Sequence, residues 1–300
     1  MSETIDAQPS WYQRHYHLLR RLHSLTGILP IGVFLIVHLL TNSSILWGKV
    51  GLRGEGAAGD LTRGGVEYFT KEVVWINREV PHLILIEIVL WLSIGFHSVL
   101  GVIYAMSGRP NSARYAYPDN WRYTLQRVSG YLGILFIFYH VATLRWGWTW
   151  LVPGGTQWDY RFAASTLAAA LQGGTDGMRL SNGALFVSIG YFVGITMLVF
   201  HFANGLWTAA ITWGLTVSAQ AQRRWGFVCT AIGAGLMVMA WGALFRFATL
   251  PYQEARQTET AAQGAAAAPV DDRDTAAAPG KSLADGAAGN AGSQGLKRAR

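Results

Sequence analysis

The stretch RRLHSLTGILPIGVFLIVHLL (residues 20–40) decides the fold class of this chain. Two arginines precede an apolar run that continues to Trp47, and His38 is the one ionisable residue between positions 26 and 47. About twenty apolar residues cross a bilayer as a helix. The run is too long for the hydrophobic region of a secretory signal and lacks a small-residue cleavage site, so we expect a retained transmembrane helix.

Four more runs of this kind follow along the chain. Hydropathy predicts membrane spans at 26–47, 83–106, 128–151, 184–215 and 226–249. Of the 300 residues, 51% are hydrophobic and 14% are charged, whereas soluble proteins carry about 25% charged residues. We therefore predict an all-α membrane protein with five transmembrane helices. Residues 1–25 form its cytoplasmic N-terminal segment and residues 26–249 its membrane domain.

The residues outside the spans suggest no soluble domain. Positions 250–300 are rich in Ala, Gly, Asp and Gln and bury too little apolar surface to fold alone, so we predict a disordered tail. The net charge of +7 comes from basic residues at span ends and in this tail. This placement, with no basic face on a soluble fold, favours contacts with lipid phosphate or a partner subunit and argues against nucleic acid as the partner. The single cysteine, Cys229, lies in a span, so any iron–sulfur cluster belongs to another subunit.

Arginines in three short segments predict the orientation of the chain. They lie before the first span, between the second and third, and between the fourth and fifth: Arg14, Arg20, Arg21; Arg109, Arg114, Arg122, Arg127; Arg223, Arg224. Short segments rich in Lys and Arg stay in the cytoplasm. The N-terminus is therefore expected inside, and the long loops 48–82 and 152–183 and the C-terminus outside.

Four histidines lie inside four successive spans: His38, His97, His140 and His201. An ionisable group in hydrocarbon is costly and usually faces the bundle interior with a partner or a function. A rise of 1.5 Å per residue puts His38 roughly 14 Å and His140 roughly 17 Å from the outer end, and His97 roughly 21 Å and His201 roughly 26 Å. The depths predict an outer pair, His38 with His140, and an inner pair, His97 with His201.

Two histidines at one depth on opposite walls of a four-helix bundle are what a bis-histidine haem needs. The first four spans are therefore predicted to form a bundle that binds two b-type haems. The alternative is four core histidines bonded to the backbone or to each other. Another metal is disfavoured because no carboxylate or cysteine joins either pair. Glycines near the histidines leave room for a macrocycle, or only for close helix packing: Gly95, Gly101, Gly130, Gly133, Gly190, Gly194 and Gly205.

The stretch at 20–40 resembles the first helix of the dihaem cytochrome b subunit of succinate:quinone oxidoreductases, in their single-polypeptide, five-helix type. The resemblance extends to GFHSVLGVIYA (95–105), NWRYTLQRVSG (120–130), FYHVATLRW (138–146) and FHFANGLWTAAITWG (200–214). It covers all four histidine-bearing helices, in the same order and with matching spacing, but not the loops or the tail.

The resemblance implies a membrane anchor for two peripheral subunits, located in the bacterial cytoplasmic membrane. A flavoprotein subunit oxidises succinate, and an iron–sulfur subunit passes the electrons to this chain and on to a membrane quinone, which we expect to be menaquinone. In the family pattern, His97 and His201 ligate the proximal haem iron and His38 and His140 the distal one. Some members carry a Glu that serves proton movement where this chain has Val199, so that path is not expected here.

Cationic and hydrogen-bonding side chains are expected at the haem propionates. Candidates for the inner haem are Arg21, His23, Ser24 and Arg127, of which the resemblance supports His23 and Ser24, and Arg145 is the candidate for the outer haem. The arginines have the alternative of anchoring in lipid headgroups. Glu87, the only carboxylate well inside a span, is predicted to relay protons at an outer quinone site. Its alternative is a carboxylate that snorkels to the interface or forms a hydrogen bond to a neighbouring helix.

The favoured function is therefore the membrane-anchor subunit of succinate dehydrogenase. The sequence does not separate it from a quinol:fumarate reductase anchor, which runs the same reaction in reverse. A haem-free proton channel or transporter with histidine relays is disfavoured because the spans contain few acids and amides. A purely structural anchor with degenerate histidines is disfavoured because all four are retained.

Overall fold

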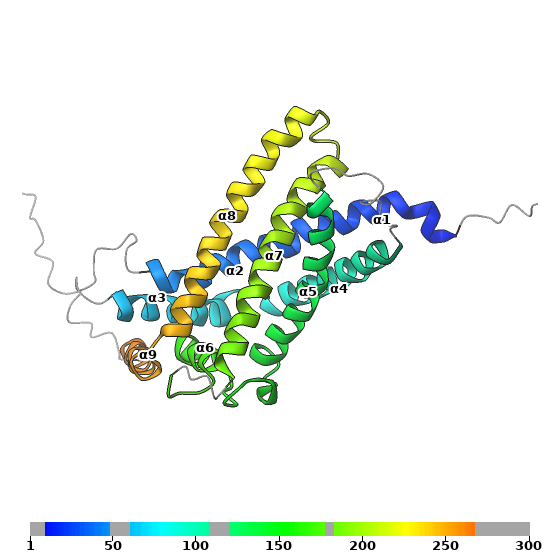
Figure 1. The fold of residues 1–300 in the computed structure, drawn as a ribbon. Helices are drawn as coiled ribbons and strands as arrows, with labels where there is room; N and C mark the ends of the chain where they lie inside the picture. The colour runs from blue at the N-terminus through cyan, green and yellow to red at the C-terminus, as the bar shows by residue number, and fades with distance from the viewer. Residues whose placement is uncertain (1–9, 49–60, 108–119, 178–182, 268–300) are drawn as a thin grey trace, which may run out of the picture.

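The computed structural model describes residues 10–48, 61–107, 120–177 and 183–267, and this part of the chain is helical, without strands (Figure 1). The elements in order are α1 (Trp11–Ile28), α2 (Pro30–Trp47), α3 (Leu61–Glu79), α4 (Leu83–Ser107), α5 (Asn120–Leu144), η1 (Thr149–Leu151), η2 (Tyr160–Phe162), α6 (Ala163–Gln172), α7 (Ala184–Thr212), α8 (Ala219–Thr249) and α9 (Tyr252–Ala267). Within these described ranges, five segments are long and apolar enough to cross a membrane: α1 with α2, then α4, α5, α7 and α8. The predicted fold class is confirmed.

The first membrane segment begins fifteen residues before the predicted start at 26, because α1 extends back to Trp11. A capping box starts this helix: the Ser10 hydroxyl accepts from the Gln13 backbone N–H, and the Gln13 side chain accepts from the Ser10 N–H. Helix α2 follows α1 after Leu29 and has Pro30 at its first position, where the missing N–H is not needed. Together the two helices form a 37-residue segment.

The third membrane segment also differs from its prediction. Residues 128–151 were expected, whereas α5 runs from Asn120 to Leu144. The chain turns after Leu144 because Gly147 adopts a left-handed conformation, φ 69°, which ends helices readily. The fifth segment begins at Ala219 rather than 226, and the Ser218 hydroxyl caps it at the Ala221 N–H.

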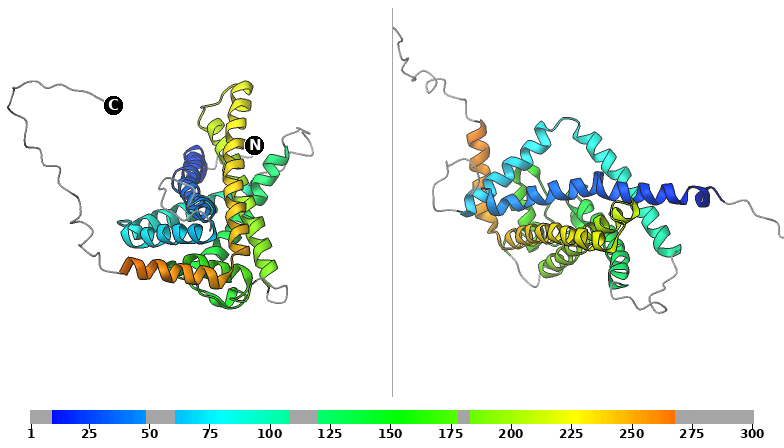
Figure 2. Two further views of the ribbon diagram at one scale, coloured as in Figure 1. Left: turned by 90° about the vertical axis from the view of Figure 1, so that its left-hand side faces the viewer. Right: turned by 90° about the horizontal axis from the view of Figure 1, so that it is seen from above.

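Helices α3, α6 and α9 gather at one end of the bundle and form what we call the helical cap (Figures 1 and 2). The other end of the bundle is the open end. Helix α3 lies in the predicted loop 48–82 and α6 in the loop 152–183. Helix α3 buries four side chains at helical spacing, Val66, Phe69, Thr70 and Val73, a pattern readable in the sequence.

The prediction of a disordered tail from residue 250 is wrong for Tyr252–Ala267, which forms α9. Tertiary contacts hold this helix: Ala255 and Glu259 are 1% and 0% exposed against α3 and α6. The Glu259 carboxylate accepts from the Thr70 hydroxyl at 3.0 Å and from the backbone N–H of Ala164, in the first turn of α6, at 2.8 Å. Residues 268–300, the rest of the predicted tail, and the Gly-rich stretch 51–60 lie outside the described residues.

Helix α7 is the centre of the membrane bundle and packs between α5 and α8, while α2 lies against α8 and α4 lies against α1 (Figure 2). Large apolar side chains point away from the bundle; Ile84, Phe186 and Phe245 are each more than 70% exposed. Such an apolar exterior suits lipid. The main buried core lies between the bundle and the helical cap and includes Ile45 and Tyr191.

Candidate functional site

The four histidines predicted as metal ligands lie on four helices, α2, α4, α5 and α7, and their rings form two pairs. The ring centroids of His38 and His140 lie 5.8 Å apart with an interplanar angle of 86°. Those of His97 and His201 lie 6.0 Å apart at 80°. These are the pairs derived from depth. We call His38 and His140 the cap-side pair, and His97 and His201 the open-end pair.

The depth of His140 itself was overestimated. Because α5 ends at Leu144, four residues after His140, the histidine lies about 6 Å from that helix end rather than roughly 17 Å. His38 still meets it because α2 runs on beyond this level into the helical cap, where Ile45 is buried.

Both pairs have the spacing of two axial ligands on one iron. An imidazole nitrogen bonds a metal at about 2.0 Å, so each ring centre lies about 3 Å from the metal and two opposed rings about 6 Å apart. The observed separations, 5.8 and 6.0 Å, fit this value. In the described part of the chain no cluster of three or more His, Cys, Asp or Glu forms.

The backbone orients the rings of the open-end pair. The His97 Nδ1 lies 2.9 Å from the His23 carbonyl oxygen, and the His201 Nδ1 lies 3.1 Å from the Gln126 carbonyl oxygen. The Ser129 hydroxyl is 3.2 Å from the same His201 nitrogen. With Nδ1 donating to these oxygens, Nε2 of each ring is left for a metal. Sequence reasoning missed Gln126 and Ser129, because 75 and 72 positions separate them from His201.

The cap-side pair has side-chain partners instead. The His140 Nδ1 lies 3.3 Å from the Tyr191 hydroxyl. The Asn42 amide donates to the His38 carbonyl at 2.8 Å and lies 3.3 Å from the His38 Nε2. Asn42 follows His38 by one helical turn, so helical spacing could have predicted this contact. Tyr191 is far from His140 in the sequence, so no local pattern could have predicted it.

Two glycines leave room for the open-end histidines. A Cβ at Gly27 would lie 2.6 Å from the His97 Cε1, and one at Gly130 would lie 3.2 Å from the His201 Cε1. Sequence reasoning selected Gly130 but missed Gly27. Of the other selected glycines, Gly95 and Gly190 face no atom within 4 Å, Gly101 faces the His23 ring, Gly133 and Gly194 face Leu198 and Phe136, and Gly205 faces Gln126.

Two of the predicted propionate partners lie beside the open-end pair. The His23 ring stacks on the His97 ring with centroids 4.0 Å apart. Within the described residues, the His23 Nδ1 and the Ser24 hydroxyl are buried without a hydrogen-bond partner. Such orphaned polar atoms are the exception in folded proteins and suit a site for a bound polar group. Arg21 lies over the Trp213 ring and Arg127 over the Tyr123 ring, also toward the open end.

The structure brings together two residues that were given separate roles. Arg145 donates from Nε to the Glu87 Oε1 at 3.1 Å and from its guanidinium Nη2 to Oε2 at 3.0 Å. This bidentate pair links α4 to the end of α5. One turn further along α4, Trp91 stacks on Trp146 with ring centroids 5.7 Å apart. Glu87 therefore forms the hydrogen bond to a neighbouring segment that was the alternative to a proton relay. Arg145, the candidate partner of the outer haem propionate, binds a carboxylate of this chain.

Two remaining positions behave as ordinary packing sites. Cys229 is a buried free cysteine in α8. Val199, where some relatives of the resembled family carry a Glu, is 1% exposed in a small apolar core between α2, α7 and α8.

Comparison with known proteins identifies the family of the chain. No family model matches the chain. The chain is 31% identical, over 229 residues, to the succinate dehydrogenase cytochrome b558 subunit of Bacillus subtilis (strain 168). The match covers 76% of this chain and 95% of that protein. The chain therefore belongs to the family of succinate dehydrogenase cytochrome b subunits.

Proposed function

We propose that this chain anchors succinate dehydrogenase in the membrane, holds two b-type haems and passes electrons from the iron–sulfur subunit to a membrane quinone. The observation that carries the proposal is the presence of two imidazole pairs, each with ring centroids about 6 Å apart, at two levels of one bundle. Each haem supplies a one-electron carrier. Two imidazoles on one iron leave no open coordination position, which favours electron transfer over oxygen chemistry.

In this proposal the open-end pair binds the proximal haem and the cap-side pair binds the distal one. The carbonyl groups of His23 and Gln126 fix the Nδ1 protons of His97 and His201 and aim Nε2 of both rings at the iron. His23 and Ser24, with their unpartnered buried atoms, would bind a propionate of this haem. Arg21 and Arg127 would add positive charge near it.

The flavoprotein and iron–sulfur subunits would dock at the open end. The arginines of α1, α5 and the start of α8 lie in the segments at this end: Arg14, Arg20, Arg21, Arg122, Arg127, Arg223 and Arg224. Their charge predicts a cytoplasmic location for the open end and an external one for the helical cap. Electrons would then enter at the proximal haem and leave near the cap.

We place the quinone on the cap side, beside the Glu87–Arg145 pair. Both groups lie near the cap ends of α4 and α5, and the stacked indoles of Trp91 and Trp146 form an aromatic surface next to them. The carboxylate would exchange protons with the quinone oxygens, and Arg145 would hold the carboxylate in place or reach a propionate of the distal haem. Menaquinone is the expected quinone. The same residues would serve a quinol:fumarate reductase running in reverse.

Difference spectroscopy on the purified complex tests this function. We expect reduced-minus-oxidised spectra with two b-type centres and two haems per chain. His97→Ala or His201→Ala should remove one centre and His38→Ala or His140→Ala the other, whereas the control His17→Ala, at an exposed position on α1, keeps both. Equal loss of both centres from every single change would contradict the two pairs. A protein without haem would contradict the proposal and favour a proton channel.

The direction of the reaction needs a separate assay. Succinate oxidation with a quinone and fumarate reduction with a quinol are measured on the same preparation, and the faster reaction at matched concentrations identifies the dehydrogenase or the reductase. Co-purification of a flavoprotein and an iron–sulfur subunit is expected in either case, and a chain isolated from cells without them would contradict the anchor role.

A further inference from the structure

We propose that Tyr191 is a positioning residue for the distal haem, whose hydroxyl holds the Nδ1 proton of His140 and thereby sets the donor strength of that ligand. The proposal rests on the proposed function, in which His140 binds the distal haem iron. It assigns a role to a residue of α7, a helix whose own histidine, His201, belongs to the open-end pair.

The contact is buried and tightly enclosed. Tyr191 is 7% exposed, and its hydroxyl oxygen lies 3.3 Å from the His140 Nδ1. The two rings meet at an interplanar angle of 66° with centroids 5.8 Å apart. Phe136, one turn before His140 on α5, packs edge-on against the Tyr191 ring at 5.2 Å. With its ring held in this way, the tyrosine has little freedom to aim its hydroxyl elsewhere.

The direction of this hydrogen bond follows from the ligand chemistry. A neutral imidazole that binds iron through Nε2 carries its proton on Nδ1. The His140 Nδ1–H therefore donates, and the Tyr191 oxygen accepts. The phenolic proton is then left for another acceptor.

The two pairs thus differ in the acceptor that faces Nδ1. His97 and His201 each face a backbone carbonyl oxygen, which no side-chain substitution removes, and the Ser129 hydroxyl is a second neighbour of the His201 Nδ1. His140 donates to a phenol. A hydrogen bond accepted from Nδ1–H increases the basicity of a ligating imidazole and stabilises the oxidised metal. Removing the phenolic oxygen should therefore raise the midpoint potential of the distal haem and leave that of the proximal haem unchanged.

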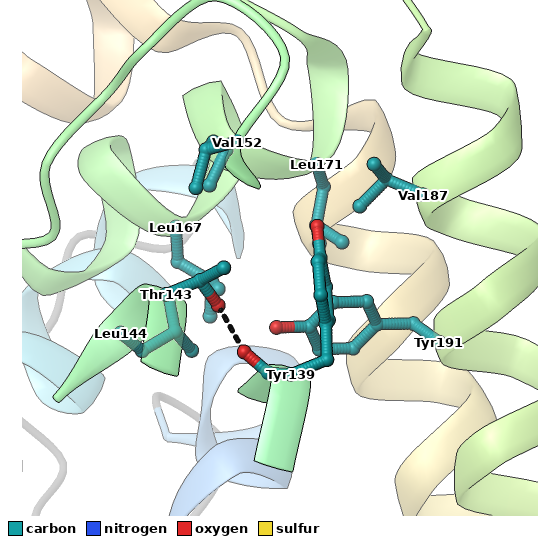
Figure 3. A pocket seen from close by; sticks show the side chains of 9 residues that line it. Tyr139, Thr143, Leu144, Val152, Leu167, Leu171, Val187 and Tyr191 are labelled. Carbon is teal, nitrogen blue, oxygen red and sulfur yellow. Dashed lines mark hydrogen bonds between the residues drawn. The ribbon is translucent and has the colours of Figure 1, made fainter. Parts of the chain in front are cut away.

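The helical cap holds Tyr191 in position. Tyr191 belongs to the buried core between the bundle and the cap, where Leu167 and Leu171 of α6 line a small pocket with it (Figure 3). In the same pocket the hydroxyl of Tyr139 donates to the Leu151 carbonyl at 3.2 Å and makes no bond to His140. Tyr139 therefore provides a matched control: the same side chain in the same pocket, bonded elsewhere.

The experiment is a redox titration of the purified complex, with Tyr191→Phe and Tyr139→Phe compared with the unmodified protein. The shifted haem is assigned from the spectra of the single-histidine variants. We expect Tyr191→Phe to retain two haems, to raise the midpoint potential of the distal haem alone, and to shift the low-spin electron paramagnetic resonance signal of that haem alone. Tyr139→Phe should leave both potentials and both signals unchanged.

The outcomes separate this inference from the function on which it rests. An unmodified protein without haem contradicts the proposed function. If the unmodified protein holds two haems, the role of Tyr191 is refuted by unchanged potentials in Tyr191→Phe. It is equally refuted by an equal shift in Tyr139→Phe, which would assign the effect to the polarity of the pocket. Loss of the distal haem from Tyr191→Phe would also refute the inference, because the hydroxyl would then be needed to retain the haem and not to set its potential.

Discussion

Replacing Glu259 should open the helical cap. This carboxylate is fully buried and ties α9 to the other two cap helices. Its Oε1 accepts from the Thr70 hydroxyl at 3.0 Å and from the backbone N–H groups of Ala164 and Ser165 at 2.8 and 3.3 Å. Its Oε2 accepts from the Ser165 hydroxyl. Glu259 thus satisfies N–H groups in the first turn of α6 that have no partner within that helix.

The magnitude follows from the groups left unpaired in Glu259→Ala. A buried donor without a partner costs about 1–3 kcal/mol. The Ser165 hydroxyl has a second acceptor in the Phe162 carbonyl at 3.3 Å. The two backbone N–H groups alone, at about 1–3 kcal/mol each, give a loss of about 2–6 kcal/mol, and the Thr70 hydroxyl, which also loses its acceptor, adds to it. In contrast, Glu259→Gln keeps the oxygen that accepts three of the four hydrogen bonds, and should cost less than about 1 kcal/mol.

Hydrogen–deuterium exchange of α6 and α9 measures this loss locally. A loss of about 2–6 kcal/mol accelerates exchange through local opening roughly 30- to 20,000-fold, because each 1.4 kcal/mol is about a factor of ten. Amides of α7 near His201 provide an internal reference that should not change. Unchanged exchange of α6 in Glu259→Ala, or equal acceleration in Glu259→Gln, would refute the assignment of Glu259 as the link of the cap.

The stability of the cap should also depend on pH. Burial raises the pKa of Glu259 above its ordinary value of 4.5, although the hydrogen bonds from Ser165, Ala164 and Thr70 oppose the shift. An acid with a raised pKa binds its proton more tightly in the folded state. The resulting stabilisation is complete below pH 4.5 and is lost as the pH rises through the folded-state pKa. Exchange rates of α6, corrected for intrinsic pH dependence, should show this trend, and Glu259→Gln should abolish it.

Two further changes test the bundle. Gly27→Ala places a Cβ 2.6 Å from the His97 ring, so it should displace this ligand and remove the proximal haem. Gly95→Ala, whose Cβ meets no atom within 4 Å, should keep both haems in the same difference spectrum. Retention of both haems in Gly27→Ala, or loss of a haem from Gly95→Ala, would contradict the close packing of Gly27 against His97. For the bidentate pair, Glu87→Ala and Arg145→Ala should each lower quinone reduction and the melting temperature, and the double variant should be no worse than either single one. Additive losses in a double-mutant cycle would show that the two side chains act independently.

Much of the membrane domain was predictable from the sequence. Five spans, their order and the histidine pairs follow from hydropathy and from positions along helices, which are local properties. The predicted pairing needed only relative depths, so it survived an error of several residues at the end of α5. The capping box at Ser10 and the buried spacing in α3 were also present in the sequence, although they were not used.

Hydropathy and residue spacing were enough to predict the fold class and the two histidine pairs, because membrane insertion forces apolar runs into parallel helices of known rise. The partners of the polar groups, in contrast, could be read only from the packed helices. Glu87 meets Arg145 across 58 positions, His140 meets Tyr191 across 51, and Thr70 meets Glu259 across 189. Such contacts depend on how each helix is rotated and where it ends, and residue order leaves both open until the helices have packed.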